Sequence, residues 1–286
     1  MGSSPIRPTN VYGRVRVSAW NVQKQEHSKK PSNRGMRYCS SMAQVQDGLN
    51  QTQAFALIFE TTSTRNLLGY GLWALRNARF WETTRDPILT MLSIGVEKML
   101  KMSLGLAHVA ERGEWPPLTT FRDTWRHNIG NMQDDLMQTI RSRLPEATHP
   151  AYVESQLVEV ENDPVLPLLM AALSRYGQSG RFYHLDELAL SPQAGEDPRH
   201  MWSEAENVAL RLDAAMKARF EAASSNPDPE VFDAFVHELE ARLAASIERW
   251  WDVVALAGKH GIFGERGGGW GHDVDKSMVG RQIREG

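Results

Sequence analysis

The chain has 286 residues, enough for one large helical domain or two smaller ones. Its 41% hydrophobic and 23% charged residues are ordinary for a soluble globular protein, and the absence of any apolar run of about 18 residues predicts no membrane span. A single cysteine excludes an internal disulfide and a paired-cysteine zinc site, and it favours a reducing, cytoplasmic setting. The polar N-terminus lacks the apolar core of a secretory signal.

Charge is unevenly distributed along the chain. Residues 1–41 hold eight Lys or Arg and one acid, a net charge of +7, so the remaining residues carry −10 of the overall −3. A basic arm on an acidic body is compatible with nucleic-acid contact, because phosphate neutralisation does not depend on sequence. The alternative is a solvated tail, or one that docks on its own acidic body, and charged termini favour this reading.

The first half of the chain predicts long helices. Residues 51–81 favour helix without an interrupting proline, and Asp86 followed by Pro87 predicts the start of a second helix that ends near Glu111. One face of this second helix carries residues at alternating spacings of three and four: Leu89, Leu92, Val96, Met99, Ser103 and Leu106. Glu97 is expected to pair with Lys101 on its solvent face.

Glycines and a capping residue mark the next boundaries. Gly95 and Gly105 each cost about 1 kcal/mol of helix propensity relative to alanine, and this cost makes most sense where another backbone approaches closely. Gly113 is expected to end the helix. Asn128 is one of the candidate caps for a third helix over residues 129–143.

The second half predicts three further helices over residues 165–176, 200–223 and 230–258, the last two as an antiparallel pair. Asp228 as cap and Pro229 in the first turn begin the final helix. Its apolar stripe consists of Phe232, Phe235, Leu239, Leu243, Ile247, Trp250 and Val254.

The predicted fold class is therefore all-α, an antiparallel bundle of long helices over residues 46–260. A basic, largely irregular arm over residues 1–45 precedes the bundle, and a flexible, Gly-rich tail over residues 261–286 follows it, without a fixed core element. Within the arm, residues 11–17 alternate in part between apolar and polar, which is compatible with a short strand, and Trp20 is the one bulky anchor.

The first candidate site is the segment that contains Arg122, Asp123, Arg126 and His127. An arginine and a histidine at this spacing can converge on one phosphate at a helix N-terminus, with Asp123 as a supporting polar neighbour. Histidine changes charge near neutral pH and can act as general base or acid, while arginine binds the phosphate as a fork and stabilises charge in the transition state. The alternative, which the spacing alone favours, is a capping segment with solvated arginines and His127 bonded to a carbonyl.

A second candidate surrounds a glycine-bounded loop over residues 177–180. Arg175, Arg181, Tyr183 and His184 lie beside this loop, and their side chains can bind an anion. The alternative is that the aromatic side chains plug the end of the bundle.

No metal and no cofactor are expected. The C-terminal residues His260, Glu265, His272 and Asp273 are of metal-ligand type, but all except His260 lie inside the predicted tail. The chain has no GxGxxG, GxxxxGK[ST], HExxH, GxSxG or EF-hand motif, which argues against dehydrogenases, P-loop NTPases, zincins and α/β-hydrolases. The tryptophans Trp250, Trp251 and Trp270 are expected in the core or on a partner-facing patch.

Two short motifs resemble those of the HEPN superfamily of helical bundles. The sequence GVEKMLK at residues 95–101 is similar to the A-x-E-K-x-x-K-A-like helix of that family, and His127 followed by Asn128 is similar to its His-Asp-Leu-like helix start. Gly180, Arg181 and Phe182 resemble the Arg-Tyr-Pro-like element before the last family helix. The resemblance covers about residues 51–223.

The resemblance implies a helical bundle, frequently dimeric, in RNA- or nucleotide-related systems that include toxin–antitoxin and antiviral-defence modules. Active members are metal-independent ribonucleases with an Arg-x(4–6)-His motif, and Arg122 and His127 have that spacing. RNA or a nucleotide is therefore an expected partner, together with a second copy or a protein partner. The alternative hypothesis is a non-catalytic helical interaction or dimerisation protein.

Overall fold

The computed structural model describes residues 48–78 and 81–280, without the side chains of Trp81 and Glu82. Every regular element in these ranges is helical, so the predicted all-α class is confirmed. The basic arm predicted over residues 1–45, with Trp20 and its strand-like segment, lies outside the described residues.

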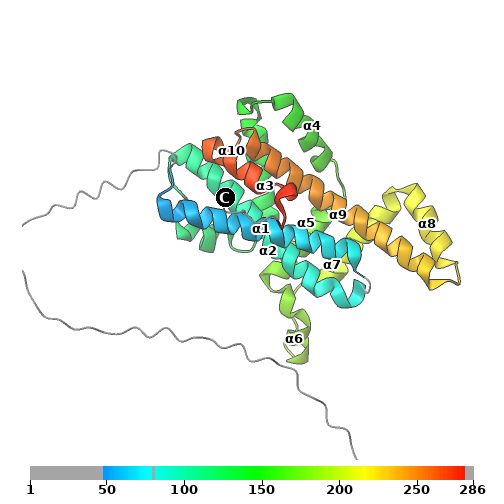
Figure 1. Ribbon diagram of the computed structural model, residues 1–286. Coiled ribbons are helices and arrows are strands. Elements are labelled where there is room, and N and C mark those ends of the chain that lie inside the picture. Colours follow the sequence, from blue (N-terminus) through cyan, green and yellow to red (C-terminus); the bar gives the residue numbers. More distant parts are fainter. Residues whose placement is uncertain (1–47, 79–80, 281–286) are drawn as a thin grey trace, which may run out of the picture. The chain divides into compact units, whose positions relative to one another are not determined.

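The helices α1 (Gln51–Asn77) and α2 (Trp81–Arg112) form a long hairpin, shown in Figure 1. Asn50 and Gln53 begin α1 with a capping box, in which each side chain accepts a hydrogen bond from the other residue's backbone N–H at 2.9 Å. The predicted apolar face of α2, from Leu89 to Leu106, is buried as expected. Gly113 ends α2 at a φ of +76°.

The predicted start of α2 at Asp86 and Pro87 is wrong. The helix begins at Trp81, and Pro87 lies inside it. Asp86 does not cap the helix because its carboxylate accepts two hydrogen bonds from the Arg199 guanidinium, at 3.1 and 2.6 Å. Asp86, which the local sequence predicts as a helix cap, thus forms a tertiary ion pair inside the helix instead.

The middle of the chain forms three helices: α3 (Ile129–Arg143), α4 (Pro150–Glu161) and α5 (Leu166–Gln178). The bounds of α3 are those predicted, and the Asn128 side chain caps it by accepting from Asn131 N at 3.2 Å. No helix was expected where α4 lies, although Pro150 occupies its first turn.

A short turn at Gly180–Phe182 leads into α6 (Tyr183–Leu188), which projects from the other helices in Figure 1. The predicted single helix over residues 200–223 is in fact α7 (Pro198–Leu212) and α8 (Ala214–Ser224). Asp213 separates the two because its backbone is extended, and its carboxylate caps α8 by accepting from Ala215 N and Met216 N.

The helix α9 (Pro229–Lys259) carries much of the core and packs against α4, α1, α7, α8 and α10. Asp228 and Pro229 begin this helix as predicted. Trp250 and Trp251 are fully buried, which confirms their expected place in the core.

The prediction that residues 261–286 hold no fixed core element is wrong for residues 261–280. Residues Gly264–Asp273 form α10, which packs closely on α9 and buries Trp270. A Cβ atom at Gly271 would lie 2.4 Å from Lys259 N, so glycine is what permits this approach. Tertiary packing therefore overrides the low helix propensity of the glycines. Residues 281–286 lie outside the described part.

The two glycines inside α2 also mark close contacts. A Cβ at Gly95 would lie 3.1 Å from the backbone nitrogen of Leu68 in α1, which confirms a close backbone approach. A Cβ at Gly105 would instead lie 2.5 Å from the ring of Trp115. Among the described residues, no helix is both long and apolar enough to cross a membrane.

Candidate functional site

The segment that contains Arg122 forms a π-helical turn at Thr120–Trp125, before α3. The Arg122 guanidinium donates to both carboxylate oxygens of its neighbour Asp123, at 2.7 and 3.0 Å. This hydrogen bonding raises the pKa of Arg122 and lowers the pKa of Asp123. The Arg122 side chain is 69% exposed, so the pair lies open to solvent.

His127 lies next to α3 but faces α2. Its Nδ1 is 3.1 Å from each carboxylate oxygen of Glu97, whose side chain is only 15% exposed. The same carboxylate accepts from Lys101 Nζ at 2.7 Å, and Lys101 also donates to the backbone oxygen of Arg126 at 2.6 Å. The predicted Glu97–Lys101 pair is confirmed, but its expected place on the solvent face is wrong. It joins α2 to the turn that carries His127.

A cavity of about 200 Å³ opens beside this pair, between α2, α5 and the turns before α3 and α6; we call it the polar cavity. The side chains of Lys98 and Arg181 line it together with Glu97 and His127. Its complete lining is Thr90, Ser93, Ile94, Glu97, Lys98, His127, Tyr176, Gly177 and Arg181. The structure therefore places His127 with Arg181, whereas Arg122 does not line this cavity.

Three hydroxyl-bearing side chains, those of Thr90, Ser93 and Tyr176, complete the polar cavity. Ser93 is 1% exposed, and its Oγ has no hydrogen-bond partner among the described residues. Tyr176 donates to the backbone oxygen of Asp86 at 3.2 Å, and its hydroxyl lies 2.7 Å from Thr90 Oγ1. A Cβ at Gly177 would lie 2.7 Å from Ser93 Oγ, so glycine keeps this side of the cavity open. The cavity thus combines two cations, a histidine–carboxylate pair and an unpaired hydroxyl.

His184, predicted with Arg181 as an anion-binding residue, lies outside the polar cavity but shares a second cavity with Arg181. Its Nδ1 is 3.0 Å from Glu187 Oε2, and its Nε2 is 3.6 Å from Asp197 Oδ2. It lines a neighbouring cavity of about 220 Å³ that Arg181 also lines. The expected aromatic plug is absent here, because Phe182 is 47% exposed and stacks under Arg181, with 5.0 Å between guanidinium carbon and ring centroid.

The remaining basic candidates take no part in the polar cavity. Arg126 is exposed and has a φ of +47°, where it ends the π-helical turn. Arg175 is bound to the loop before α7 through the Glu196 backbone oxygen, at 2.9 Å, and the Gln193 side chain, also at 2.9 Å. Its role is to hold this loop.

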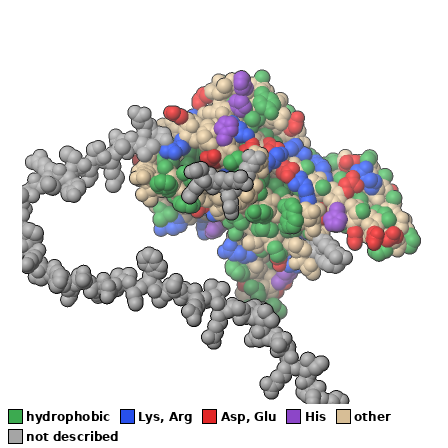
Figure 2. Space-filling model, viewed as in Figure 1, with side chains coloured by type: hydrophobic (Ala, Val, Ile, Leu, Met, Phe, Trp, Pro, Cys, Tyr) green, Lys and Arg blue, Asp and Glu red, His purple; other side chains and the backbone are tan. Residues whose placement is uncertain are grey.

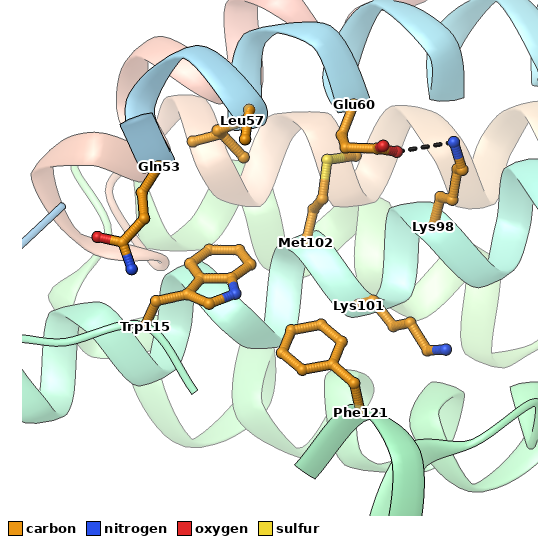
Figure 3. Close-up of a pocket in the computed structure, with 9 residues that line it drawn as sticks. Gln53, Leu57, Glu60, Lys98, Lys101, Met102, Trp115 and Phe121 are labelled. Atoms are coloured by element: carbon orange, nitrogen blue, oxygen red, sulfur yellow. Dashed lines mark ion pairs between the residues drawn. The ribbon is translucent and has the colours of Figure 1, made fainter. Parts of the chain in front are cut away.

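A larger cavity of about 320 Å³ lies beside the polar cavity, between α1, α2 and the segment that carries Trp115 and Phe121; it is drawn in Figure 3, and we call it the aromatic cavity. Trp115 and Phe121 form one wall, and Lys98 pairs with Glu60 of α1 at 2.7 Å on its edge. The lining comprises Gln53, Ala56, Leu57, Glu60, Lys98, Lys101, Met102, Trp115 and Phe121. Lys98 lines both this cavity and the polar cavity.

Sequence reasoning missed several of these residues for an identifiable reason. The sequence presents Glu97, Lys98 and Lys101 only as part of a helix motif. Their position beside His127 depends on how α3 packs against α2, which the motif does not reveal. Ser93 carried no signal at all. Among the C-terminal residues of metal-ligand type, His260 lies against the ring of His149, with 5.3 Å between centroids. No group of three or more potential metal ligands occurs in the described ranges.

Comparison of the chain with protein-family models, with curated proteins and with solved structures finds no match.

Proposed function

We propose that this protein is a metal-independent ribonuclease that binds and cleaves an RNA phosphodiester in the polar cavity. The observation that carries the proposal is the meeting of His127, bonded to Glu97, with Lys98 and Arg181 in one cavity. An oriented histidine supplies acid–base chemistry, and two cations supply phosphate binding. The arginine in this proposal is Arg181, which replaces the Arg122 of the sequence-based hypothesis.

Glu97 determines which nitrogen of His127 reacts. A carboxylate beside Nδ1 favours the tautomer with the proton on Nδ1, which leaves Nε2 as the base. Lys101 donates to the same carboxylate and holds it in place beside the imidazole. His127 and Glu97 therefore act as a base and its positioning residue.

The proposed reaction uses the 2′-hydroxyl of the RNA as nucleophile. His127 Nε2 takes the proton of this hydroxyl, the oxygen attacks phosphorus, and the bond from phosphorus to the 5′-oxygen breaks. The leaving oxygen takes a proton from water, and the protonated His127 returns its proton to the hydroxide that remains. The products are a 2′,3′-cyclic phosphate and a 5′-hydroxyl. Arg181 and Lys98 stabilise the charge that grows on the phosphoryl oxygens.

The HEPN-like motifs support the same proposal. The first motif contains Glu97 and Lys101, and the second contains His127. Glu97 contacts both Lys101 and His127. By this resemblance, the protein would act in an RNA-related or antiviral-defence system.

The test is cleavage of a labelled single-stranded RNA in the presence of a chelator, with the product ends identified. We expect cyclic-phosphate ends from the wild type, and no cleavage of a substrate whose 2′-hydroxyl groups are replaced by hydrogen. His127→Ala and Arg181→Gln should each lose activity. The matched control is Arg219→Gln, because Arg219 lies on the surface of α8, where it pairs with Glu238 of α9. Undiminished cleavage by both His127→Ala and Arg181→Gln would refute the assignment.

A second candidate function, homodimerisation through α1, rests on a different observation. The exposed large apolar side chains of α1 are Phe55, Ile58, Phe59, Tyr70 and Trp73. Figure 2 shows hydrophobic side chains at the surface of this helix, and Val279 and Gly280 lie against its middle, at Gly69 and Asn66. Each of the exposed apolar side chains of α1 exposes roughly 100 Å², so pairing two copies would bury about 1,000 Å² at their centre, close to the lower bound for a specific interface.

The charges on α1 favour a second copy as the occupant of this surface. Glu60 pairs with Lys98, Arg65 donates to the Asp273 backbone oxygen, and Arg76 pairs with Glu248. Pairing α1 with α1 of a second copy would therefore bring no unpaired like charges together. An interface in which the same surface of each copy pairs with the other gives a closed twofold dimer. Light scattering after size exclusion should show a dimer that Phe59→Asp converts to a monomer; a monomeric wild type would refute this candidate.

A further inference from the structure

The geometry points to a nucleobase-binding subsite in the aromatic cavity, next to the phosphate-binding polar cavity. This inference rests on the proposed function and adds the part of the nucleotide that the polar cavity does not hold. Its substrate is a nucleotide of single-stranded RNA, with the base against Trp115 and Phe121 and an adjacent phosphate near Lys98 and Arg181.

The two rings of the aromatic wall are nearly parallel and held in place. The rings of Trp115 and Phe121 are inclined by only 19°, with 6.1 Å between centroids, and Figure 3 shows both beside the open space of the cavity. Trp125 packs its edge against Phe121 at 4.8 Å, and Gly105 provides the room that the Trp115 ring occupies against α2. A planar ligand ring can stack against an aromatic ring that is held in this way.

The rest of the lining selects an aromatic ring over a charged group. Ala56, Leu57 and Met102 supply apolar surface, and the Lys98 ammonium at the edge is already paired with the Glu60 carboxylate. The Lys101 ammonium is likewise paired with Glu97. Stacking on aromatic side chains tolerates any base, because every base has a π face. The apolar and aromatic lining of this cavity therefore fits the base of a nucleotide better than its phosphate.

Lys98 connects the two cavities. It lines both, and its neighbours on α2 divide between them, with Ile94 and Glu97 on the polar side and Lys101 and Met102 on the aromatic side. From Ile94 to Lys101 the helix rises about 10 Å. One ligand can therefore occupy both cavities only if it joins a ring and an anion over a short distance, as a nucleotide does.

The test measures binding of three probes to the full chain by calorimetry: adenosine 3′-monophosphate, adenosine and ribose 5-phosphate. We expect the mononucleotide to bind about ten-fold or more tightly than ribose 5-phosphate, the difference that one stacked base supplies. Trp115→Leu should remove this difference and leave ribose 5-phosphate binding unchanged. Arg181→Gln should weaken both phosphate-bearing probes and leave adenosine unchanged.

Two further variants complete the design. Tyr152→Leu removes an exposed aromatic ring on α4, outside both cavities, and should bind all three probes like the wild type. Gly105→Ala keeps every aromatic side chain but forces the Trp115 ring to move, so it should also lose the base-dependent part of the affinity. It serves in place of Trp115→Leu if thermal unfolding shows that the latter is not folded.

The outcomes separate the two proposals. Wild-type affinity for the mononucleotide in both Trp115→Leu and Gly105→Ala would overturn the base subsite, as would a mononucleotide that binds no better than ribose 5-phosphate. Trp115-dependent binding of adenosine, with no contribution from the phosphate or from Arg181, would support the base subsite and refute the proposed ribonuclease site.

Discussion

Two glutamates, Glu97 half-buried and Glu240 buried, occupy contrasting regions of this bundle. Glu97 in α2 lies at the polar cavity, where its carboxylate accepts hydrogen bonds from Lys101 and meets His127. Glu240 in α9 is 2% exposed, and neither of its carboxylate oxygens has a hydrogen-bond partner among the described residues. Burial raises the pKa of Glu240 to about 8; nearby Glu206 adds to the rise and Arg85 opposes it. The two carboxylates thus differ in whether hydrogen-bond donors meet them.

The same substitution at the two positions gives the sharpest test of this contrast. Glu97→Gln should lower kcat/KM for RNA cleavage by about 10²–10⁴-fold, because an amide has no charge to stabilise the imidazolium and can turn its NH2 group toward Nδ1, which selects the wrong tautomer. The matched variant Glu238→Gln, on the exposed surface of α9, should cleave like the wild type. Equal rates for the wild type and Glu97→Gln would show that His127 needs no carboxylate.

Glu240→Gln should instead alter how the free energy of unfolding depends on pH. The folded chain holds the Glu240 proton more tightly than the ordinary pKa of 4.5 implies. The stabilising contribution is therefore fully present below pH 4.5 and is lost as pH rises through about 8. Each unit of difference corresponds to about 1.4 kcal/mol, so the charged form costs several kcal/mol.

Denaturant unfolding at pH 5 and pH 9 measures this effect. The wild type should lose more stability between the two values than Glu240→Gln does. A constant cost of the buried amide cancels in this comparison, because it is present at both pH values. Parallel pH profiles would contradict a protonated Glu240 in the folded chain.

Asp163 extends the comparison to a third acid. It is buried like Glu240, and its carboxylate accepts hydrogen bonds like that of Glu97. Burial acts to raise its pKa, but hydrogen bonds from Ser246, Val165 N and Arg249 outweigh burial and hold the pKa below the usual value. Its contribution to stability is therefore present above the unfolded-state pKa and is lost as pH falls through the folded value.

Asp163→Asn should destabilise the fold by about 1–3 kcal/mol near pH 7. The loss follows because Arg242 and Arg249 of α9 would lose their common carboxylate. The difference between variant and wild type, measured by denaturant unfolding, should shrink as pH is lowered toward 3. A difference that stays constant across that range would assign the loss to packing rather than charge.

Arg122→Gln should have the smallest effect. The side chain lies open to solvent with Asp123 and outside the polar cavity, and exposed ion pairs contribute little. RNA cleavage and unfolding should both remain within experimental error of the wild type, whereas Arg181→Gln should lose cleavage. A loss in Arg122→Gln that equals the loss in Arg181→Gln would restore the original Arg122–His127 hypothesis.

Local sequence determined much of the fold. Asn128 and the pattern of residues 129–143 fixed α3, Asp228 and Pro229 fixed the start of α9, and the spacing of Glu97 and Lys101 predicted their ion pair. These features depend on contacts within a few residues, where helix geometry and capping rules apply directly. The candidate His127 came from the same short-range signals.

The tertiary structure alone decided the remaining features. Gly-rich α10 forms because α9 offers it a closely fitting surface, and Asp86 leaves its capping role because Arg199 reaches it from α7. In the same way, Arg181 rather than Arg122 shares a cavity with His127. Each of these contacts joins residues more than ten positions apart. Their meeting depends on the packing of whole helices, and no local pattern in the sequence encodes it.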